Sequence, residues 1–320
     1  MYHSKRIRFT VLAGAGVAGM LALTGCGAAE TGGSSGGSDK VTLAQPSWVG
    51  AQANVAVAKK LLEDELDVKV DVRQMDEPAA FDALNSGKAD AILEDWGGVP
   101  KKEKLYVEEK KTVVNAGGLG VEGHIGWFVP KYYAEKHPDV TDYKNLNKYW
   151  KDFQTSESGD KGQFLGAAPS YTTHDKELIK NHDLNFKIVP TGSEAAELKE
   201  IKRLYDAKKP FIGYWWQPQW MNAEIEMVEV KLPPYKEGCL EPVEKATCGY
   251  DTLELQKYLN ADFAKNGGDA AQFLKNMKWS TDDQNKVAQM IAGEDMDPDD
   301  AAAAWIKDNK STWEKWLPKK

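Results

Sequence analysis

Basic residues are a minority in this sequence, and its only long apolar run lies near the N-terminus. Lys and Arg number 41 against 49 Asp and Glu, which gives a formal net charge of -8. Nucleic-acid binding requires a basic surface that releases counterions, so this charge balance argues against it. The mean hydropathy of -0.55 argues against a polytopic membrane protein. The composition is instead typical of a soluble globular protein of one large or two modest domains.

Recognisable catalytic and metal-binding motifs are also missing. The five histidines, at positions 3, 124, 137, 174 and 182, form no metal-ligand spacing, and no phosphate loop, dinucleotide fingerprint or GxSxG motif occurs. Glu94 and Asp95 are adjacent, so they point apart and make a poor acid–base pair. We therefore expect no enzyme, no cofactor and no metal. A glycan-processing enzyme with a tryptophan-lined cleft remains the alternative class.

The N-terminus is typical of a bacterial lipoprotein. Lys5, Arg6 and Arg8 precede an apolar stretch over residues 9–22, which is shorter than the ~20 residues of a membrane span. The sequence LTGC then ends at Cys26, and a Gly/Ser-rich tether follows. We expect a signal peptide over 1–25, lipidation of Cys26 and a tether over 26–40. The protein would be extracytoplasmic, anchored by lipid alone to the outer face of the bacterial cell membrane. A plain secretory signal is the alternative.

Only two cysteines remain after Cys26. Cys239 and Cys248 flank a short loop that contains Pro242, and glycines stand beside both cysteines. Outside the cytoplasm such a pair is expected to form a disulfide. A metal site is the weaker reading, because no histidine lies near.

Periodicity along the mature chain predicts two α/β units. Strand patterns at 41–48, 67–74 and 89–93 alternate with helical patterns at 51–66 and 78–86, which is typical of a parallel sheet covered by helices. A second unit has strands at 125–129, 163–168, 186–189 and 210–215 with helices at 142–151, 174–182 and 193–207. Helices are expected at 251–264, 269–277, 281–293 and 298–317. We predict one lobe from 41–124 plus 233–320 and another from 125–232.

Aromatic residues follow several of these strands. Trp48, Trp96, Tyr171 and Trp216 each come just after or at the end of a predicted strand, and Trp216 lies in the sequence GYWWQPQW. Open α/β sheets bind ligands at the carboxyl ends of their strands. An aromatic face attracts a weakly hydrated cation, by about 0.5 to 2 kcal/mol per ring when desolvated. The four rings therefore predict a cage for a quaternary ammonium group, with plain core packing as the alternative.

The sequence resembles the substrate-binding lipoproteins of ABC importers for glycine betaine, choline and related compounds. The resemblance lies in the lipobox and in the motifs PSWVGAQANVAVAKKLLE, EDW, GWFVP, APSY and YWWQPQW. It implies a two-lobed, type II periplasmic-binding-protein-like α/β fold with a ligand cleft between lobes. It also implies an ABC permease as partner and the cage Trp48, Trp96, Tyr171 and Trp216. Trp215 is expected to point into the lobe, and contact of Trp127, Trp215 or Trp220 with ligand stays open.

Polar candidates for the rest of the ligand are Val49, Gly50, Ser170, Thr172 and Gln219. The first two open a helix whose N–H groups suit an anion, so we expect glycine betaine to be preferred over choline. Choline, carnitine or another small solute is the alternative ligand. Two positions depart from the family pattern: Tyr171 stands where Trp is frequent, and Gln219 stands where His or Tyr is frequent.

Overall fold

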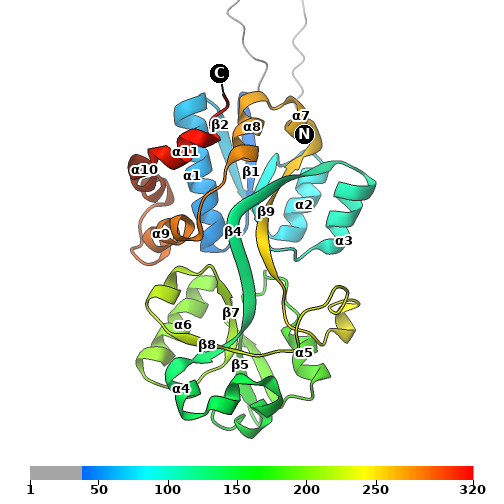
Figure 1. The fold of residues 1–320 in the computed structure, drawn as a ribbon, viewed down its shortest axis with the longest axis vertical. Coiled ribbons are helices and arrows are strands. Elements are labelled where there is room, and N and C mark those ends of the chain that lie inside the picture. The colour runs from blue at the N-terminus through cyan, green and yellow to red at the C-terminus, as the bar shows by residue number, and fades with distance from the viewer. Residues whose placement is uncertain (1–37, 320) are drawn as a thin grey trace, which may run out of the picture. The chain divides into compact units, whose positions relative to one another are not determined.

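The computed structural model describes residues 38–319. The predicted signal peptide, the lipidation site Cys26 and most of the tether lie outside the described residues. The first lobe opens with a β-α-β-α-β unit (Figure 1): β1 (Lys40–Gln45), α1 (Val49–Leu66), β2 (Lys69–Gln74), α2 (Glu77–Asn85) and β3 (Ala91–Asp95). β1 pairs in parallel with both β2 and β3, as the alternating pattern predicts. α3 (Pro100–Glu103) and a π-helical turn (Lys104–Glu109) follow.

Two long strands join this unit to the second lobe. β4 (Val113–Pro130) has 18 residues, and β9 (Thr252–Asn260) runs antiparallel to it from Val113↔Asn260 to His124↔Thr252. The far end of β4 pairs instead with β7 (Gly213–Gln217) and β8 (Met227–Val230). The strand order is β2-β1-β3-β9-β4-β7-β5-β6, with β8 paired to β4. One hydrogen-bonded sheet therefore runs through both lobes (Figure 1).

The second lobe repeats the α/β arrangement. β5 (Gly162–Gly166) pairs in parallel with β6 (Phe186–Pro190) and β7. Its helices are α4 (Lys131–Lys136), α5 (Asp175–Asn181) and α6 (Glu194–Asp206). Ser193 caps α6 by accepting from the N–H of Ala196, as the sequence around it predicts. Residues 142–151, expected as an α-helix, form a 3-10 segment at Tyr143–Lys148.

The C-terminal helices return to the first lobe. They are α7 (Ala261–Asn266), α8 (Gly268–Asn276), α9 (Thr281–Ala292), α10 (Pro298–Asp308) and α11 (Lys310–Trp313), and α8, α9 and α10 all pack against α1. Trp279, Trp305, Trp313 and Trp316 are buried here. The rings of Trp305 and Trp316 stack with centroids 5.8 Å apart. These tryptophans are therefore core-packing residues of the first lobe.

One predicted element is wrong. Residues 251–264, expected as a helix, form the central strand β9 and then the short helix α7. Leu255, Lys257 and Leu259 are all buried at two-residue spacing, which is a strand pattern with a lysine at one inward position. The Lys257 ammonium donates to the main-chain carbonyls of Lys275 and Met277. The buried Lys257 interrupts the alternation of apolar and polar residues in the sequence. Pairing with β3 and β4 makes the segment a strand.

The segment that carries the disulfide packs with the second lobe. Cys239 and Cys248 are bonded, with Cα atoms 6.0 Å apart. Asn181 of α5 donates to the carbonyls of Glu244 and Ala246 in this loop. The segment from 233 to the start of β9 was grouped with the first lobe from the sequence. These contacts tie the disulfide loop to α5 of the second lobe.

The disulfide closes a loop with a sequence separation of 9. Replacing both Cys239 and Cys248 by serine is expected to lower the free energy of unfolding by about 2–3 kcal/mol, because the unfolded chain regains the entropy of that loop. Urea unfolding of the mature domain measures this. Reductant should destabilise the parent and leave the double variant unchanged. Equal stability of the two proteins would contradict the expectation.

Candidate functional site

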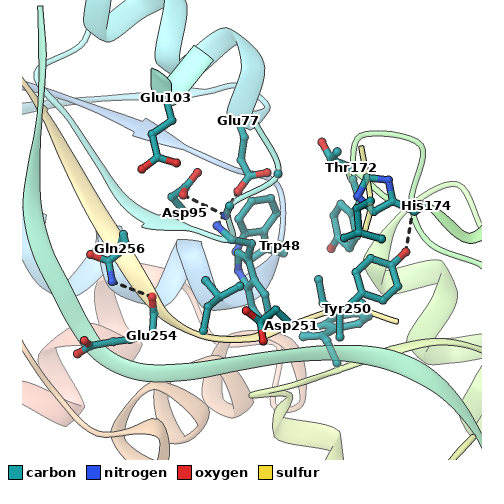
Figure 2. Close-up of a pocket in the computed structure, with 18 of the residues that line it drawn as sticks. Trp48, Glu77, Asp95, Glu103, Thr172, His174, Tyr250, Asp251, Glu254 and Gln256 are labelled. Atoms are coloured by element: carbon teal, nitrogen blue, oxygen red, sulfur yellow. Dashed lines mark hydrogen bonds between the residues drawn. The ribbon is translucent and has the colours of Figure 1, made fainter. Parts of the chain in front are cut away.

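A cavity of about 460 Å³ lies between the lobes. Figure 2 shows part of its lining, with Trp48 and Asp95 on one side and His174 and Tyr250 on the other. The four rings expected from the sequence all line it, although they come from four separate segments. Trp48 follows β1 and Trp96 follows β3, whereas Tyr171 follows β5 and Trp216 lies on β7. The carboxyl ends of the strands thus meet at this cavity, as in other open α/β sheets.

The rings meet edge to face. Tyr171 lies 5.6 Å from Trp48, at an interplanar angle of 90°, and 6.0 Å from Trp216, at 84°. Tyr171 therefore contacts one ring of the first lobe, Trp48, and one ring of the second lobe, Trp216. Perpendicular walls of this kind present several π faces to one enclosed volume, which is the arrangement that favours a methylated cation.

A single carboxylate holds two of the tryptophans. The indole N–H groups of Trp48 and Trp96 both donate to Glu94 Oε1, at 2.6 and 2.8 Å. The other oxygen, Oε2, accepts from the side-chain amides of Asn54 and Gln284. Burial raises the pKa of Glu94 to about 7, while these four donors pull it back toward the ionised form. Glu94 therefore fixes where both indole rings lie.

The charged groups that line the cavity are acidic. They are Glu77, Asp95, Glu103, Asp251 and Glu254, and no Lys or Arg of residues 38–319 belongs to the lining. Burial raises the pKa of Asp95 to about 7 and that of Glu77 well above its ordinary value. Asp95 Oδ1 is buried with no hydrogen-bond partner. Where these carboxyls are ionised, they attract cations into the cavity and repel anions.

The sequence analysis does not identify four further tyrosines of the lining: Tyr214, Tyr235, Tyr250 and Tyr258. Tyr214 is two residues from Trp216 on β7, so both face the same side of the strand, and this spacing was a usable signal. Tyr250 comes from the disulfide segment; its hydroxyl accepts from the N–H of His174 and donates to Asp175. No local pattern marked Tyr250, because its place depends on packing against α5.

Of the five polar candidates, only Thr172 lines this cavity. The N–H of Val49 donates to Glu194 Oε2 at 2.6 Å, and the Gln219 amide donates to Glu194 Oε1 at 3.0 Å. Ser170 lies 3.2 Å from Ser47 and, like Val49, borders a separate cavity of about 610 Å³. Gly50 packs against Gln284 and Glu94. These groups are engaged within the protein.

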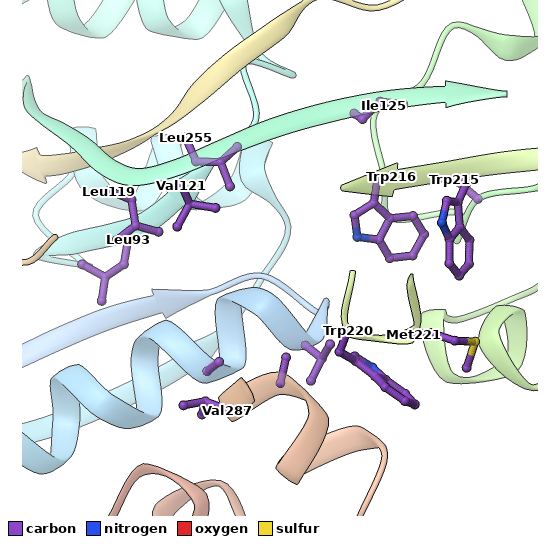
Figure 3. Close-up of a cluster of buried hydrophobic side chains, with 14 of the residues drawn as sticks. Leu93, Leu119, Val121, Ile125, Trp215, Trp216, Trp220, Met221, Leu255 and Val287 are labelled. Carbon is purple, nitrogen blue, oxygen red and sulfur yellow. The ribbon is translucent and has the colours of Figure 1, made fainter. Parts of the chain in front are cut away.

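The three tryptophans whose contact with ligand the sequence leaves open, Trp127, Trp215 and Trp220, lie outside the lining of the 460 Å³ cavity. Trp127 and Trp215 are fully buried; their indoles donate to Asp175 and Asn222, respectively. Figure 3 shows Trp215 and Trp216 on one strand, with Trp220 on the segment that follows. The Trp215 ring packs against that of Trp216, with ring centroids 5.4 Å apart, so the two side chains do not separate as simple strand alternation predicts. Trp220 borders the 610 Å³ cavity.

Two α/β lobes with a cavity between them make up the type II fold of periplasmic solute-binding proteins. Residues 39–308 match the family described as the substrate binding domain of the ABC-type glycine betaine transport system, and the chain belongs to this family. The family supplies the extracytoplasmic solute-binding component of its transporters. No helix in residues 38–319 is long and apolar enough to cross a membrane.

Known proteins match over most of the chain. A trimethylamine N-oxide-binding protein of Pelagibacter ubique (strain HTCC1062) is 27% identical over 248 residues, covering 74% of this chain and 78% of its own. A choline-binding protein solved with choline has a TM-score of 0.69 at 20% identity and covers 87% of this chain and 91% of its own. Lactococcal OpuAC, solved in its closed conformation with glycine betaine, has a TM-score of 0.70 at 20% identity. This match covers 87% of this chain and 99% of the OpuAC chain. The structural matches establish the shared fold.

The buried acids predict that the ligand-free protein loses stability as the pH rises. Burial raises the pKa values of Glu94, Asp95 and Glu194 to about 7 in the folded state. Their contribution to stability is complete below the ordinary carboxyl pKa and is lost as the pH rises through about 7. We expect the free energy of unfolding to fall by at least about 2 kcal/mol between pH 5 and pH 8.

Urea unfolding of the mature domain at the two pH values tests this. Burial lowers the pKa of His174, so this one histidine makes the protein more stable as the pH rises and opposes the trend of the carboxyls. Surface carboxyls with lowered pKa, such as Asp139 and Glu200, act below this window. Equal or greater stability at pH 8 would contradict the assignment of raised pKa values to these carboxyls.

Proposed function

We propose that this protein captures a small quaternary or fully methylated ammonium compound in the cage Trp48, Trp96, Tyr171 and Trp216. The observation that carries the proposal is that these four rings, from both lobes, line one cavity whose charged groups are acidic. Methylated nitrogen has no N–H to donate, so polar side chains grip it poorly and aromatic faces attract it. The protein binds its solute and delivers it to an ABC permease for osmoprotectant uptake, without chemical turnover.

The part of the ligand beyond the ammonium group is expected to carry no negative charge. Glycine betaine was favoured from the sequence because the N–H groups that open α1 suit a carboxylate. Val49 gives its N–H to Glu194, and no Lys or Arg of the described residues lines the cavity. We therefore propose choline, with a neutral hydroxyl, over glycine betaine. The relative from Pelagibacter ubique, a trimethylamine N-oxide-binding protein, supports a ligand without a carboxylate.

The location follows from the N-terminal sequence and the family. We propose cleavage before Cys26, lipidation of its thiol, and a Gly/Ser tether that holds the lobes at the outer face of the cell membrane. A lipid anchor keeps the binding protein near its permease, which raises the effective concentration of the pair. Metabolic labelling with a radioactive fatty acid, and its loss in Cys26→Ala, tests the anchor.

Trp216→Ala tests the cage. We expect choline affinity to fall at least tenfold, about 1.4 kcal/mol, since one cage wall is lost. Trp150→Ala is the matched control, because Trp150 is half-buried and lies outside the cavity. Isothermal titration calorimetry on both variants measures the effect, with circular dichroism to check folding. Unchanged affinity in Trp216→Ala would remove this ring from the cage.

A cation should release protons when it binds. Glu94, Asp95 and Glu77 have raised pKa values, and a positive charge nearby favours their ionised forms. Choline does not titrate between pH 5.5 and 8, so its affinity should rise at least about fivefold over that range. Calorimetry in buffers of different ionisation enthalpy counts the protons released. Affinity that is flat or falls with pH would show that the carboxyls do not sense the ligand's charge.

A further inference from the structure

The N-terminus of α1 is stabilised by a carboxylate from the other lobe. Its N-cap residue, Trp48, makes no side-chain cap hydrogen bond, and the first turn holds no acidic residue. Glu194, at the start of α6, instead accepts from the N–H of Val49 at 2.6 Å. Gln219 donates to the second oxygen at 3.0 Å. Glu194 is buried, so this is an enclosed contact between lobes.

This position is where the lobes would otherwise receive an anion. The N-terminus of an 18-residue helix combines free N–H groups with the positive end of the helix dipole. It also adjoins the cage, because the N-cap residue is Trp48 itself. A small cavity of about 10 Å³ remains there, lined in part by Trp48, Trp216, Glu94 and Glu194. That is about the volume of one probe sphere, which a water fills and a carboxylate does not.

We propose that Glu194 is a specificity residue, a carboxylate of the protein itself that fills the anion position beside the cage and excludes ligands carrying a carboxylate. The inference rests on the proposed function and deepens it by naming what selects the ligand. A second carboxylate brought to this point finds the Val49 N–H already used and meets the charge of Glu194. Specificity gained through repulsion of the wrong ligand is common in binding sites.

The hydrogen bond between Val49 and Glu194 also joins the lobes. Its effect on closure must therefore be separated from the effect of the Glu194 charge on ligand choice. Loss of an interlobe hydrogen bond alone weakens closure and lowers affinity for every ligand equally. Loss of a repelling charge changes the ratio of two affinities. Glycine betaine and choline carry the same trimethylammonium group and differ at the carboxylate. The ratio of their dissociation constants therefore reports on Glu194 itself.

Calorimetric titration of the mature domain with choline, trimethylamine N-oxide and glycine betaine tests the inference at pH 8, above the Glu194 pKa of about 7, where its carboxylate is ionised. The parent should bind choline at least tenfold more tightly than glycine betaine. Glu194→Gln keeps the size and the hydrogen-bonding oxygen but removes the charge, and should shift the ratio at least tenfold toward glycine betaine. Glu197→Gln is the control: Glu197 is buried one turn along α6 and has no hydrogen-bond partner. Its ratio should match the parent.

The outcomes separate this inference from the proposed function. A parent that binds none of the three compounds refutes the proposed function. A parent that prefers glycine betaine refutes the role of Glu194, and this result needs no variant. If Glu194→Gln weakens both affinities equally, the residue only joins the lobes, and the specificity role is overturned. The same ratio shift in Glu197→Gln would also overturn it, because any buried carboxyl on α6 would then suffice.

Discussion

Two indole N–H groups that share one buried carboxylate oxygen are the constraint on which the site depends. Trp48 and Trp96 follow different strands, and neither position alone fixes the orientation of a ring. Glu94 holds both, and Asn54 and Gln284 hold Glu94. Donors left without this acceptor would cost about 1–3 kcal/mol each. The carboxylate thus serves as a structural acceptor for the rings and, through its charge, as part of the field that favours cations.

The lobes are tied by strands, and their inner surfaces are rich in carboxyls. Glu77, Asp95, Asp175 and Glu197 are all buried with raised pKa values. Burying so many acids without basic partners costs stability. Buried ionisable groups with shifted pKa values are common at functional sites, and a bound cation would supply the positive charge that these carboxyls lack. The site therefore trades stability of the empty protein for attraction of its ligand.

Periodicity predicted the β-α-β units and the place of the four rings, because strand ends in an open sheet meet at one edge. It failed at β9, where Lys257 interrupts the apolar alternation and finds carbonyl partners from a distant segment. It did not anticipate the first half of β4, whose sequence includes Gly117 and Gly120 at positive φ near register shifts. Glu194 was also missed, since a carboxylate 145 residues from its donor leaves no local pattern.

The division of the proposed cage between the two lobes has a consequence for transport. Trp48 and Trp96 belong to the first lobe, and Tyr171 and Trp216 belong to the second, while β4 and β9 connect the two. A solute that touches all four rings interacts with the closed arrangement more strongly than with an open one, and so shifts the population toward closure. The apparent association constant of the solute is then its intrinsic association constant multiplied by the fraction of empty protein that is already closed. Substitutions at positions of β4 that contact neither a ring nor the cavity would therefore tune uptake by changing that fraction alone.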